Sequence, residues 1–162
     1  MQRRVPVIAG CGAPSTALAS ELAVVAACSG VDALPCAPPP YSRPTQDGII
    51  GHVCLVAHAS GLPLLLHDVP ARSAVAISDV TVANLFERGL IAGIKDATGD
   101  LSRLPRLRRL CGPQLTQLGG DDATALAYRR GRQWLHLGHR QHRASPVRPP
   151  APGLEQRRAG GL

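Results

Sequence analysis

Short apolar runs alternate along the chain with longer segments in which apolar residues recur at helical spacing. The short runs are apolar on both of their alternating faces, which is typical of parallel strands covered by helices. This pattern predicts strands over 4–10, 31–37, 62–69, 91–97 and 115–120. It predicts helices over 15–28, 48–60, 78–88 and 101–111, and a further helix that begins at 121.

The residues at the ends of the predicted helices agree with these boundaries. Serine and aspartate side chains accept hydrogen bonds from the first N–H groups of a helix, and glycine commonly follows the last turn. The expected N-caps are Ser15, Ser78, Asp100 and either Asp121 or Asp122, and the expected stops are Gly30, Gly61, Gly89 and Gly112. Five strands alternating with five helices predict an α/β fold, either an open doubly wound sheet or part of a (β/α)8 barrel.

Composition bounds the kind of core and the location of the protein. The chain has 162 residues, enough for one domain, and is 44% hydrophobic but only 2% aromatic, so its core must consist of Ala, Val, Leu and Ile. No run of 18 apolar residues indicates a transmembrane helix. The five cysteines are odd in number and include no C-x-x-C pair, which argues against a zinc site or a disulfide framework. We therefore expect buried thiols in a reducing, cytoplasmic location.

The net charge of +7 belongs to one end of the chain. Residues 1–128 hold ten basic and ten acidic side chains, whereas residues 129–162 hold eight arginines and one glutamate. This irregular basic tail is rich in Arg and Pro and has no apolar periodicity. Three interpretations are a nucleic-acid arm in which Trp134 stacks on bases, a metal site, and a segment that was never selected to fold. The metal site would use His136, His139 and His142.

Polar side chains gather where the predicted strands end, and one of them is the only lysine of the chain. The C-terminal ends of parallel strands hold the active sites of α/β barrels. The residues placed there are Tyr41, His67, Asp68, Lys95, Gly120 and Asp121. A lysine at the end of an apolar strand loses hydration, which lowers the pKa of its ammonium and favours a neutral amine that can form a Schiff base. The alternative is a structural lysine paired with Asp96 or Asp100.

Five segments resemble, in the same order, the motifs of one family. They are RVPVIAGCG (4–12), PPYSRPTQDG (39–48), LLLHDVPARSA (64–74), GIKDATGD (93–100) and LGGDDATAL (118–126). The chain thus resembles the dihydrodipicolinate synthase (4-hydroxy-tetrahydrodipicolinate synthase) family of pyruvate-dependent class I aldolases, a superfamily that includes N-acetylneuraminate lyase. VPAR and KDATGD favour the synthase branch. The resemblance implies an incomplete (β/α)8 TIM barrel of about five βα units over residues 1–128, in which 4–10 match the family's third strand.

The resemblance also implies roles for five residues. Lys95 matches the lysine that forms a Schiff base with pyruvate, and Arg72 matches the arginine that binds the carboxylate of aspartate semialdehyde. Tyr41 matches a tyrosine that enters the proton relay of a neighbouring subunit, so a homo-oligomer is implied. Gly120 matches a glycine near the pyruvate site, and His67 stands where the family has a proton-donating tyrosine. The resemblance implies no cofactor, no metal, and neither a nucleic-acid nor a membrane partner.

The sequence departs from the family pattern at several positions. Asp68 replaces an asparagine, Pro40 replaces the first tyrosine of the P-Y-Y-N motif, and the G-T-T-G-E loop that cradles the pyruvate carboxylate has no counterpart. Imidazole can carry protons near neutral pH, but His67 is shorter than a tyrosine. The implied function is a lyase that condenses pyruvate with aspartate semialdehyde in lysine (diaminopimelate) biosynthesis. The alternatives are a non-catalytic, truncated remnant of that enzyme and another pyruvate-dependent aldolase, similar to N-acetylneuraminate lyase.

The family resemblance ends a few residues after Tyr128. When residues 132–143 are written in permissible codons and read one base later, they give GNGCISVTANI, which resembles the family's next strand. This match favours a frameshifted, out-of-frame tail over the nucleic-acid arm and the metal site. Sequencing of the coding DNA tests the hypothesis, because the next frame must then encode this strand and a continuing barrel.

Overall fold

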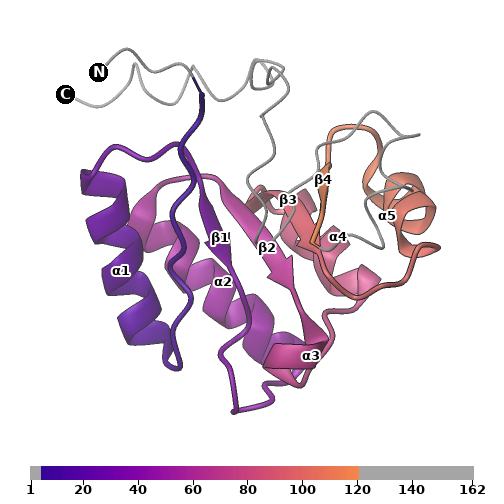
Figure 1. Ribbon diagram of the computed structural model, residues 1–162, viewed down its shortest axis with the longest axis horizontal. Helices are drawn as coiled ribbons and strands as arrows, with labels where there is room; N and C mark the ends of the chain where they lie inside the picture. The colour runs from indigo at the N-terminus through magenta and orange to yellow at the C-terminus, as the bar shows by residue number, and fades with distance from the viewer. Residues whose placement is uncertain (1–4, 121–162) are drawn as a thin grey trace.

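The computed structural model describes residues 5–120, which fold around a four-stranded parallel sheet (Figure 1). The strands are β1 (Leu34–Cys36), β2 (Leu64–Asp68), β3 (Ile91–Asp96) and β4 (Thr116–Gly119). Their order in the sheet is their order along the chain, and each pairs in parallel with the next. Parallel neighbours need a crossover between them, and helices supply it here.

The helices begin and end close to the predicted positions. They are α1 (Thr16–Cys28), α2 (Gln46–Ser60), α3 (Pro70–Ser73), α4 (Asp79–Glu87) and α5 (Arg103–Cys111). The hydroxyls of Ser15 and Ser78 accept backbone N–H groups of α1 and α4, as expected, and Thr45 does the same for α2. Gly61 and Gly112 follow α2 and α5 with positive φ angles, which glycine adopts without strain.

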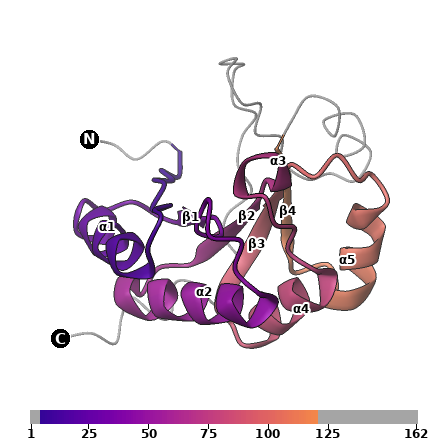
Figure 2. The same cartoon turned by 90° about the horizontal axis from the view of Figure 1, so that it is seen from below.

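The long helices cover one face of the sheet, as Figure 2 shows for α2, α4 and α5. A doubly wound sheet carries helices on both faces, whereas a barrel carries them only on the outside. This arrangement therefore decides between the two predicted architectures in favour of part of a barrel. The core between sheet and helices is aliphatic, as the composition predicted. Its largest fully buried members include Leu34, Leu64, Leu66, Ile94, Ile49, Val53, Val56, Val82, Leu85 and Leu107.

The predicted first strand is largely absent from the sheet. Within the described residues 5–11, this segment makes one isolated parallel bridge, between Ile8 and Ala33. Backbone hydrogen bonds join Ala9 N to Ala33 O at 3.3 Å and Cys11 N to Pro35 O at 3.4 Å. Pro35 has no N–H to donate in return, so a regular ladder cannot form here. The segment runs along β1 as an irregular edge.

Three further expectations need correction. Helix α5 begins at Arg103, and Asp100 is not its N-cap; Asp100 instead accepts the N–H of Ser102 at 2.9 Å in the loop before the helix. The short helix α3 was not predicted. The cysteines are not uniformly buried: Cys11 and Cys36 are, but Cys28 is exposed. The predicted helix from 121, the tail 129–162 and the expected caps Asp121 and Asp122 lie outside the described residues.

No helix within residues 5–120 combines the length and the apolar character needed to span a membrane.

Candidate active site at the strand ends

The C-terminal ends of β2 and β3 place His67 beside Lys95. In the parallel register His67 pairs with Lys95, and Lys95 pairs with Leu118 of β4. Because side chains alternate across a strand, these three side chains share one face of the sheet, and the fully buried Leu66 and Ile94 lie on the other. Lys95 and His67 therefore share the face that a closed barrel encloses.

The ionisation of Lys95 is shifted toward the neutral amine. Burial lowers the pKa of its ammonium, and the positive charge of Arg72 lowers it further. Both effects disfavour a second positive charge at this position. The direction of this pKa shift agrees with the expectation for a lysine at the end of an apolar strand. The side chain is half buried, so it is not sealed in the core.

Arg72 reaches this end of the sheet through α3, the short helix directly after β2. Pro70 occupies the first turn, and Arg72 N donates to Val69 O at 2.8 Å. Ala74 ends the turn with a φ of 57°. The guanidinium is close enough for its charge to act on Lys95. A guanidinium beside the amine is suited to bind the carboxylate of a compound that reacts with the amine.

Gly120 follows β4 at the same end of the sheet and packs directly against the backbone after Lys95. Its N–H donates to Asp96 O at 2.6 Å. A Cβ atom at this position would lie 2.5 Å from Ala97 Cβ and 2.8 Å from Asp96 O. Only glycine allows this close approach, which holds the end of β4 against the end of β3. The sequence predicted a glycine near the site but not this packing reason.

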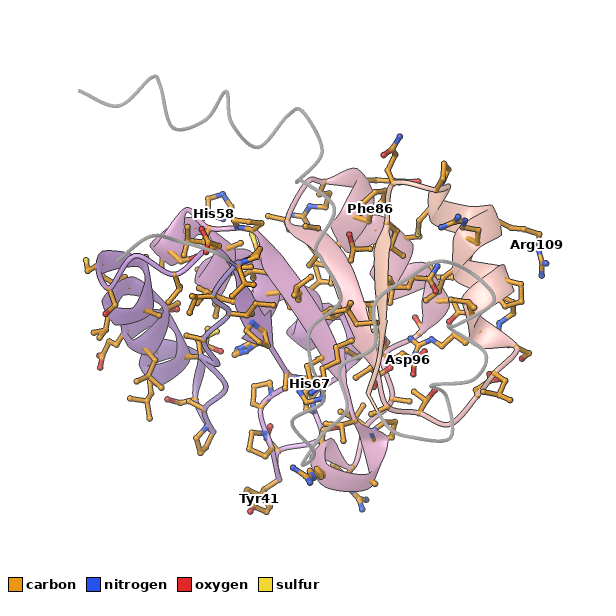
Figure 3. The ribbon with its side chains drawn as sticks, turned by 45° about the horizontal axis from the view of Figure 1, so that its top comes forward. Tyr41, His58, His67, Phe86, Asp96 and Arg109 are labelled. Carbon is orange, nitrogen blue, oxygen red and sulfur yellow. The ribbon has the colours of Figure 1, made fainter. Side chains whose placement is uncertain are left out.

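Tyr41 is not brought to the other candidate residues. It lies in the loop between β1 and α2 with a φ of 69°, and 89% of its surface is exposed. Figure 3 shows its side chain pointing away from the protein, apart from His67. The described residues therefore unite Lys95, His67, Arg72 and Gly120 at one end of the sheet and leave Tyr41 on the outer surface.

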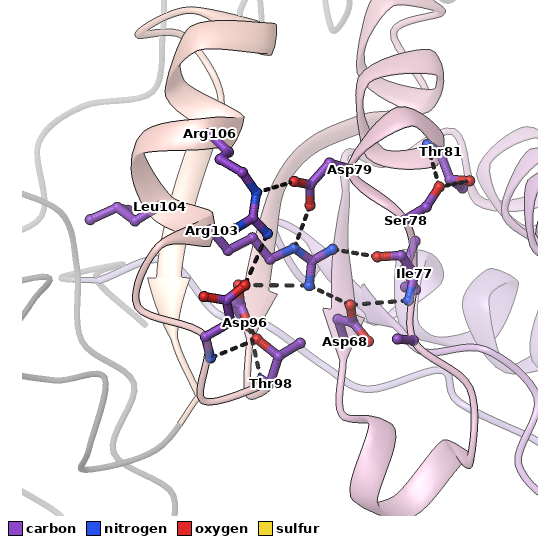
Figure 4. Close-up of polar contacts among 12 residues, drawn as sticks. Asp68, Ile77, Ser78, Asp79, Thr81, Asp96, Thr98, Arg103, Leu104 and Arg106 are labelled. Carbon is purple, nitrogen blue, oxygen red and sulfur yellow. Dashed lines mark hydrogen bonds and ion pairs between the residues drawn. The ribbon is translucent and has the colours of Figure 1, made fainter.

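The opposite face of the same strand ends holds a buried ion network that sequence reasoning missed (Figure 4). Arg103 of α5 places Nη1 2.5 Å from Asp68 Oδ2 and Nε 2.9 Å from Asp79 Oδ1. Its Nη1 is also 3.7 Å from Asp96 Oδ2, and its Nη2 donates to Ile77 O at 2.5 Å. Asp68, Asp96 and Arg103 are each at most 3% exposed. One guanidinium thus links the ends of β2 and β3, next to His67 and Lys95.

This network overturns the suggestion that Asp96 or Asp100 pairs with Lys95. Asp96 follows Lys95 in the strand, so its carboxylate points to the helix-covered face and meets Arg103. Asp100 pairs with Arg106 at 2.9 Å. Hydrogen bonds from Ser102 and Arg106 lower the pKa of Asp100 to about 2. Strand alternation was the available signal, because it places Asp68 and Asp96 on the helix side, where buried carboxylates need a cation.

Other chemistry-bearing features lie apart from Lys95. A shallow pocket of about 250 Å³ is lined by Asp79, Arg106, Arg109 and Leu110, all on α4 and α5. Within residues 5–120, no three His, Cys, Asp or Glu side chains group in a way that could hold a metal ion. The suggested metal site of His136, His139 and His142 lies outside the described residues.

Comparison with known sequences identifies the family. The sequence model of the Dihydrodipicolinate synthetase family matches residues 1–131. A 4-hydroxy-tetrahydrodipicolinate synthase of Nitrobacter hamburgensis is 46% identical over 125 residues, which cover 77% of this chain and 42% of the relative. One from Shewanella frigidimarina is 46% identical over 135 residues, covering 83% and 44% of the two chains.

Solved structures agree with the sequence relatives. The dihydrodipicolinate synthase of Acinetobacter baumannii, solved in complex with pyruvate, superposes with a TM-score of 0.79 at 39% identity, over 84% of this chain and 47% of the other. The 4-hydroxy-tetrahydrodipicolinate synthase of Methylacidiphilum fumariolicum SolV has a TM-score of 0.79 at 35% identity, over 83% and 45% of the two chains.

The parallel sheet, its one-sided helices and these structural relatives define an incomplete TIM barrel. The chain belongs to the dihydrodipicolinate synthetase family. It spans less than half the length of the curated relatives it matches.

Proposed function

We propose that this chain carries the Schiff-base half of a pyruvate-dependent aldolase, with Lys95 as the nucleophile. The supporting observation is the half-buried Lys95 amine, whose pKa is lowered by burial and by Arg72, in register with His67 at the strand ends. The neutral amine attacks the keto carbon of pyruvate, water leaves, and an iminium forms on Nζ. The iminium withdraws electrons, so the neighbouring methyl carbon can lose a proton and attack an aldehyde.

The other residues have proposed roles in the same reaction. His67 is suited to proton transfer because it is the pairing partner of Lys95 on the adjacent strand. Arg72 would bind the carboxylate of the second substrate, and the close packing of Gly120 would hold the end of β4 against the strand that carries Lys95. The proposed second substrate is aspartate semialdehyde, as the resemblance to the family implies. The exposed Tyr41 fits a role toward a neighbouring subunit, and the homo-oligomer and the cytoplasmic location stay predictions.

The test uses sodium borohydride, which reduces an iminium irreversibly to a secondary amine. Lys95 is the only lysine of the chain, so an adduct on a lysine has one possible location. With pyruvate and borohydride we expect a mass increase of one reduced pyruvate unit on the peptide that contains Lys95. The Lys95→Arg variant keeps the positive charge and should acquire no adduct at position 95. Absence of the adduct in the unmodified chain would refute the proposal.

The pH dependence of trapping probes the same amine. Because burial and Arg72 lower the pKa of Lys95, trapping should reach half its maximum below pH 10.5, the ordinary value. The Arg72→Gln variant removes the neighbouring cation, so this midpoint should rise toward 10.5. An unchanged midpoint in Arg72→Gln would show that the charge of Arg72 does not affect the pKa of Lys95.

A non-catalytic remnant of the enzyme is the second candidate. One observation favours it: Tyr41 is 89% exposed and its side chain points away from the protein, apart from His67. A Schiff base without consumption of aspartate semialdehyde would support a remnant that retains the amine. Consumption of N-acetylmannosamine in place of aspartate semialdehyde would instead support an aldolase similar to N-acetylneuraminate lyase.

A further inference from the structure

Two buried cysteines lie opposite each other, one in the segment before α1 and one at the end of β1. Ile8 forms a parallel bridge with Ala33, and Cys11 N donates to Pro35 O at 3.4 Å. The same register, carried three residues further, makes Cys36 the partner of Cys11. Figure 1 shows this segment beside β1. The two cysteines therefore occupy opposing positions on neighbouring backbones.

The spacing of the pair suits a disulfide. Neighbouring strands lie about 4.8 Å apart, within the range of about 4.4–6.8 Å between Cα atoms that a disulfide can span. Both side chains are fully buried, and a hydrogen bond joins the two thiols. Cys11 Sγ also lies 3.4 Å from Pro35 O. Both cysteines are free thiols in the structure.

The two thiols differ in their readiness to lose a proton. The hydrogen bond from Cys36 lowers the pKa of Cys11 below its ordinary value, although burial opposes the shift. The same hydrogen bond, together with burial, raises the pKa of Cys36. One thiolate is thus favoured at Cys11, with a protonated thiol beside it. A thiolate is the form of cysteine that attacks an oxidant, and the neighbouring thiol can then resolve the product.

This pair is separate from the candidate active site. Cys36 is the register partner of Leu66, which is fully buried on the helix-covered face of the sheet. Lys95 and His67 share the opposite face. Chemistry at the two thiols is therefore independent of the Schiff-base chemistry proposed for Lys95.

The backbone that carries Cys11 is weakly attached to the sheet. Within residues 5–11 it makes one isolated bridge, and its hydrogen bonds from Ala9 N and Cys11 N are 3.3 and 3.4 Å long. Most backbone hydrogen bonds are shorter, near 2.9–3.0 Å. By contrast, β2 and β3 pair along their whole length. The segment should therefore open locally more often than the central strands, which admits a small oxidant to thiols that are buried in the closed form.

We propose that Cys11 and Cys36 are a redox-active pair that hydrogen peroxide converts to a disulfide between the edge segment and β1. The Cys11 thiolate attacks one peroxide oxygen, the O–O bond breaks, and hydroxide leaves and takes up a proton to become water. The sulfenic acid formed on Cys11 is attacked by Cys36 Sγ, the S–O bond breaks, and a second water leaves with the Cys36 proton. Two thiols are oxidised and one peroxide is reduced to two waters.

The experiment treats the reduced, folded full chain with a small excess of hydrogen peroxide and then blocks the remaining thiols with N-ethylmaleimide. A chain with one disulfide keeps three of its five thiols for blocking. Cleavage after Arg, Asp and Glu separates Cys11, Cys28 and Cys36 into three peptides, so mass spectrometry identifies the bonded pair. We expect the Cys11–Cys36 pair to exceed any other pair about tenfold or more, because register partners meet the distance requirement.

The unfolded chain supplies the matched comparison. When urea precedes peroxide, pairing should follow loop length and favour Cys28 with Cys36, which are eight residues apart. In the folded Cys36→Ser variant the reaction should stop at a sulfenic acid on Cys11, which dimedone labels. The Cys28→Ser variant is the control: Cys28 is exposed and outside the pair, so the Cys11–Cys36 bond should form as before.

Two outcomes would overturn the proposal. One is a folded chain in which peroxide leaves Cys11 and Cys36 open to N-ethylmaleimide after denaturation, which would make both thiols ordinary core side chains. The other is the same distribution of pairs in the folded and the unfolded chain. Dithiothreitol should restore all five thiols, as expected of a redox-sensing disulfide in a reducing location. The Lys95→Arg variant should form the bond normally.

Discussion

At the β3–α5 end of the sheet, charged side chains are buried and paired, whereas at the N-terminal edge apolar side chains are exposed. Arg103 of α5 is almost fully buried and contacts three carboxylates, and the remaining arginines of that helix face outward. Helix α1 has one charge and exposes leucine and valine. The difference teaches that α5 pairs its buried charge within the described fold, whereas α1 leaves apolar side chains exposed there.

The largest expected effect is at Arg103. The variant Arg103→Met leaves Asp68 and Asp96 buried without their cation, which should lower the free energy of unfolding by roughly 3–5 kcal/mol. Urea denaturation followed by circular dichroism measures the loss. Arg106→Met is the control on the same helix: its side chain is 38% exposed and water screens its ion pairs, so it should lose far less stability than Arg103→Met. Equal losses in the two variants would remove the distinction between buried and exposed pairs.

Two glycine substitutions compare the two regions: Gly120 follows β4, and Gly10 lies in the segment before α1. Gly120→Ala brings a Cβ within 2.5 Å of Ala97 Cβ, so the backbone must shift, at a cost of about 1–3 kcal/mol. Gly10→Ala meets no atom within 4 Å and restricts the unfolded chain, so it should be neutral or stabilising by about 0.4–1 kcal/mol. Denaturation midpoints measure both. A larger loss at Gly10 than at Gly120 would reverse the comparison.

A smaller effect should appear in the pH dependence of stability. Burial raises the pKa of Asp68, although Arg103 opposes the shift. As pH falls from neutral, the folded state therefore binds this proton before the unfolded chain does. The Asp68 contribution to the free energy of unfolding rises through the raised pKa and becomes constant below 3.8.

The variant Asp68→Asn isolates this contribution. Subtracting its free energy of unfolding from that of the unmodified chain at each pH cancels the contributions of the other titratable groups. Asp100, with a pKa of about 2, has the opposite sign and loses stability as pH falls below the ordinary value of 3.8. Stability of the unmodified chain relative to Asp68→Asn should increase from neutral pH toward 3.8. A flat or falling difference would mean that Asp68 is not penalised by burial.

The smallest effect is expected at the exposed helix. Val25 is 62% exposed, so Val25→Ser should change the free energy of unfolding of the chain alone by less than about 0.5 kcal/mol. Thermal unfolding measures this change. A loss near that of Arg103→Met would show that Val25 is already covered.

Local sequence pattern predicted most of the helices and strands. The alternation of apolar runs with helical segments located β2, β3 and α4 within one or two residues, because caps such as Ser78 and periodic apolar positions act over a few residues. The first strand was wrong because an edge beside Pro35 cannot complete its ladder. The helix α3 was not predicted, because four residues are too few to show a helical period.

The candidate site also combines residues that the sequence predicts with contacts that only the structure shows. Lys95, His67, Arg72 and Gly120 could be named from motifs, since each occupies a short segment of recognisable sequence. That Lys95 and His67 are register partners, and that Asp96 meets Arg103 instead of Lys95, depends on contacts between distant segments. Tyr41 lies in a loop with a positive φ and is 89% exposed, and the motif predicts neither property.

The sequence by itself determined the alternation of strands and helices, the aliphatic core, the family resemblance and the position of the single lysine. These properties follow from residue type and short-range spacing. Only the tertiary structure decided that the helices lie on one face, that Arg103 joins Asp68, Asp79 and Asp96, and that α1 keeps an apolar side exposed. Burial and ion pairing depend on contacts between segments that are distant in the sequence, and a local sequence pattern does not predict those contacts.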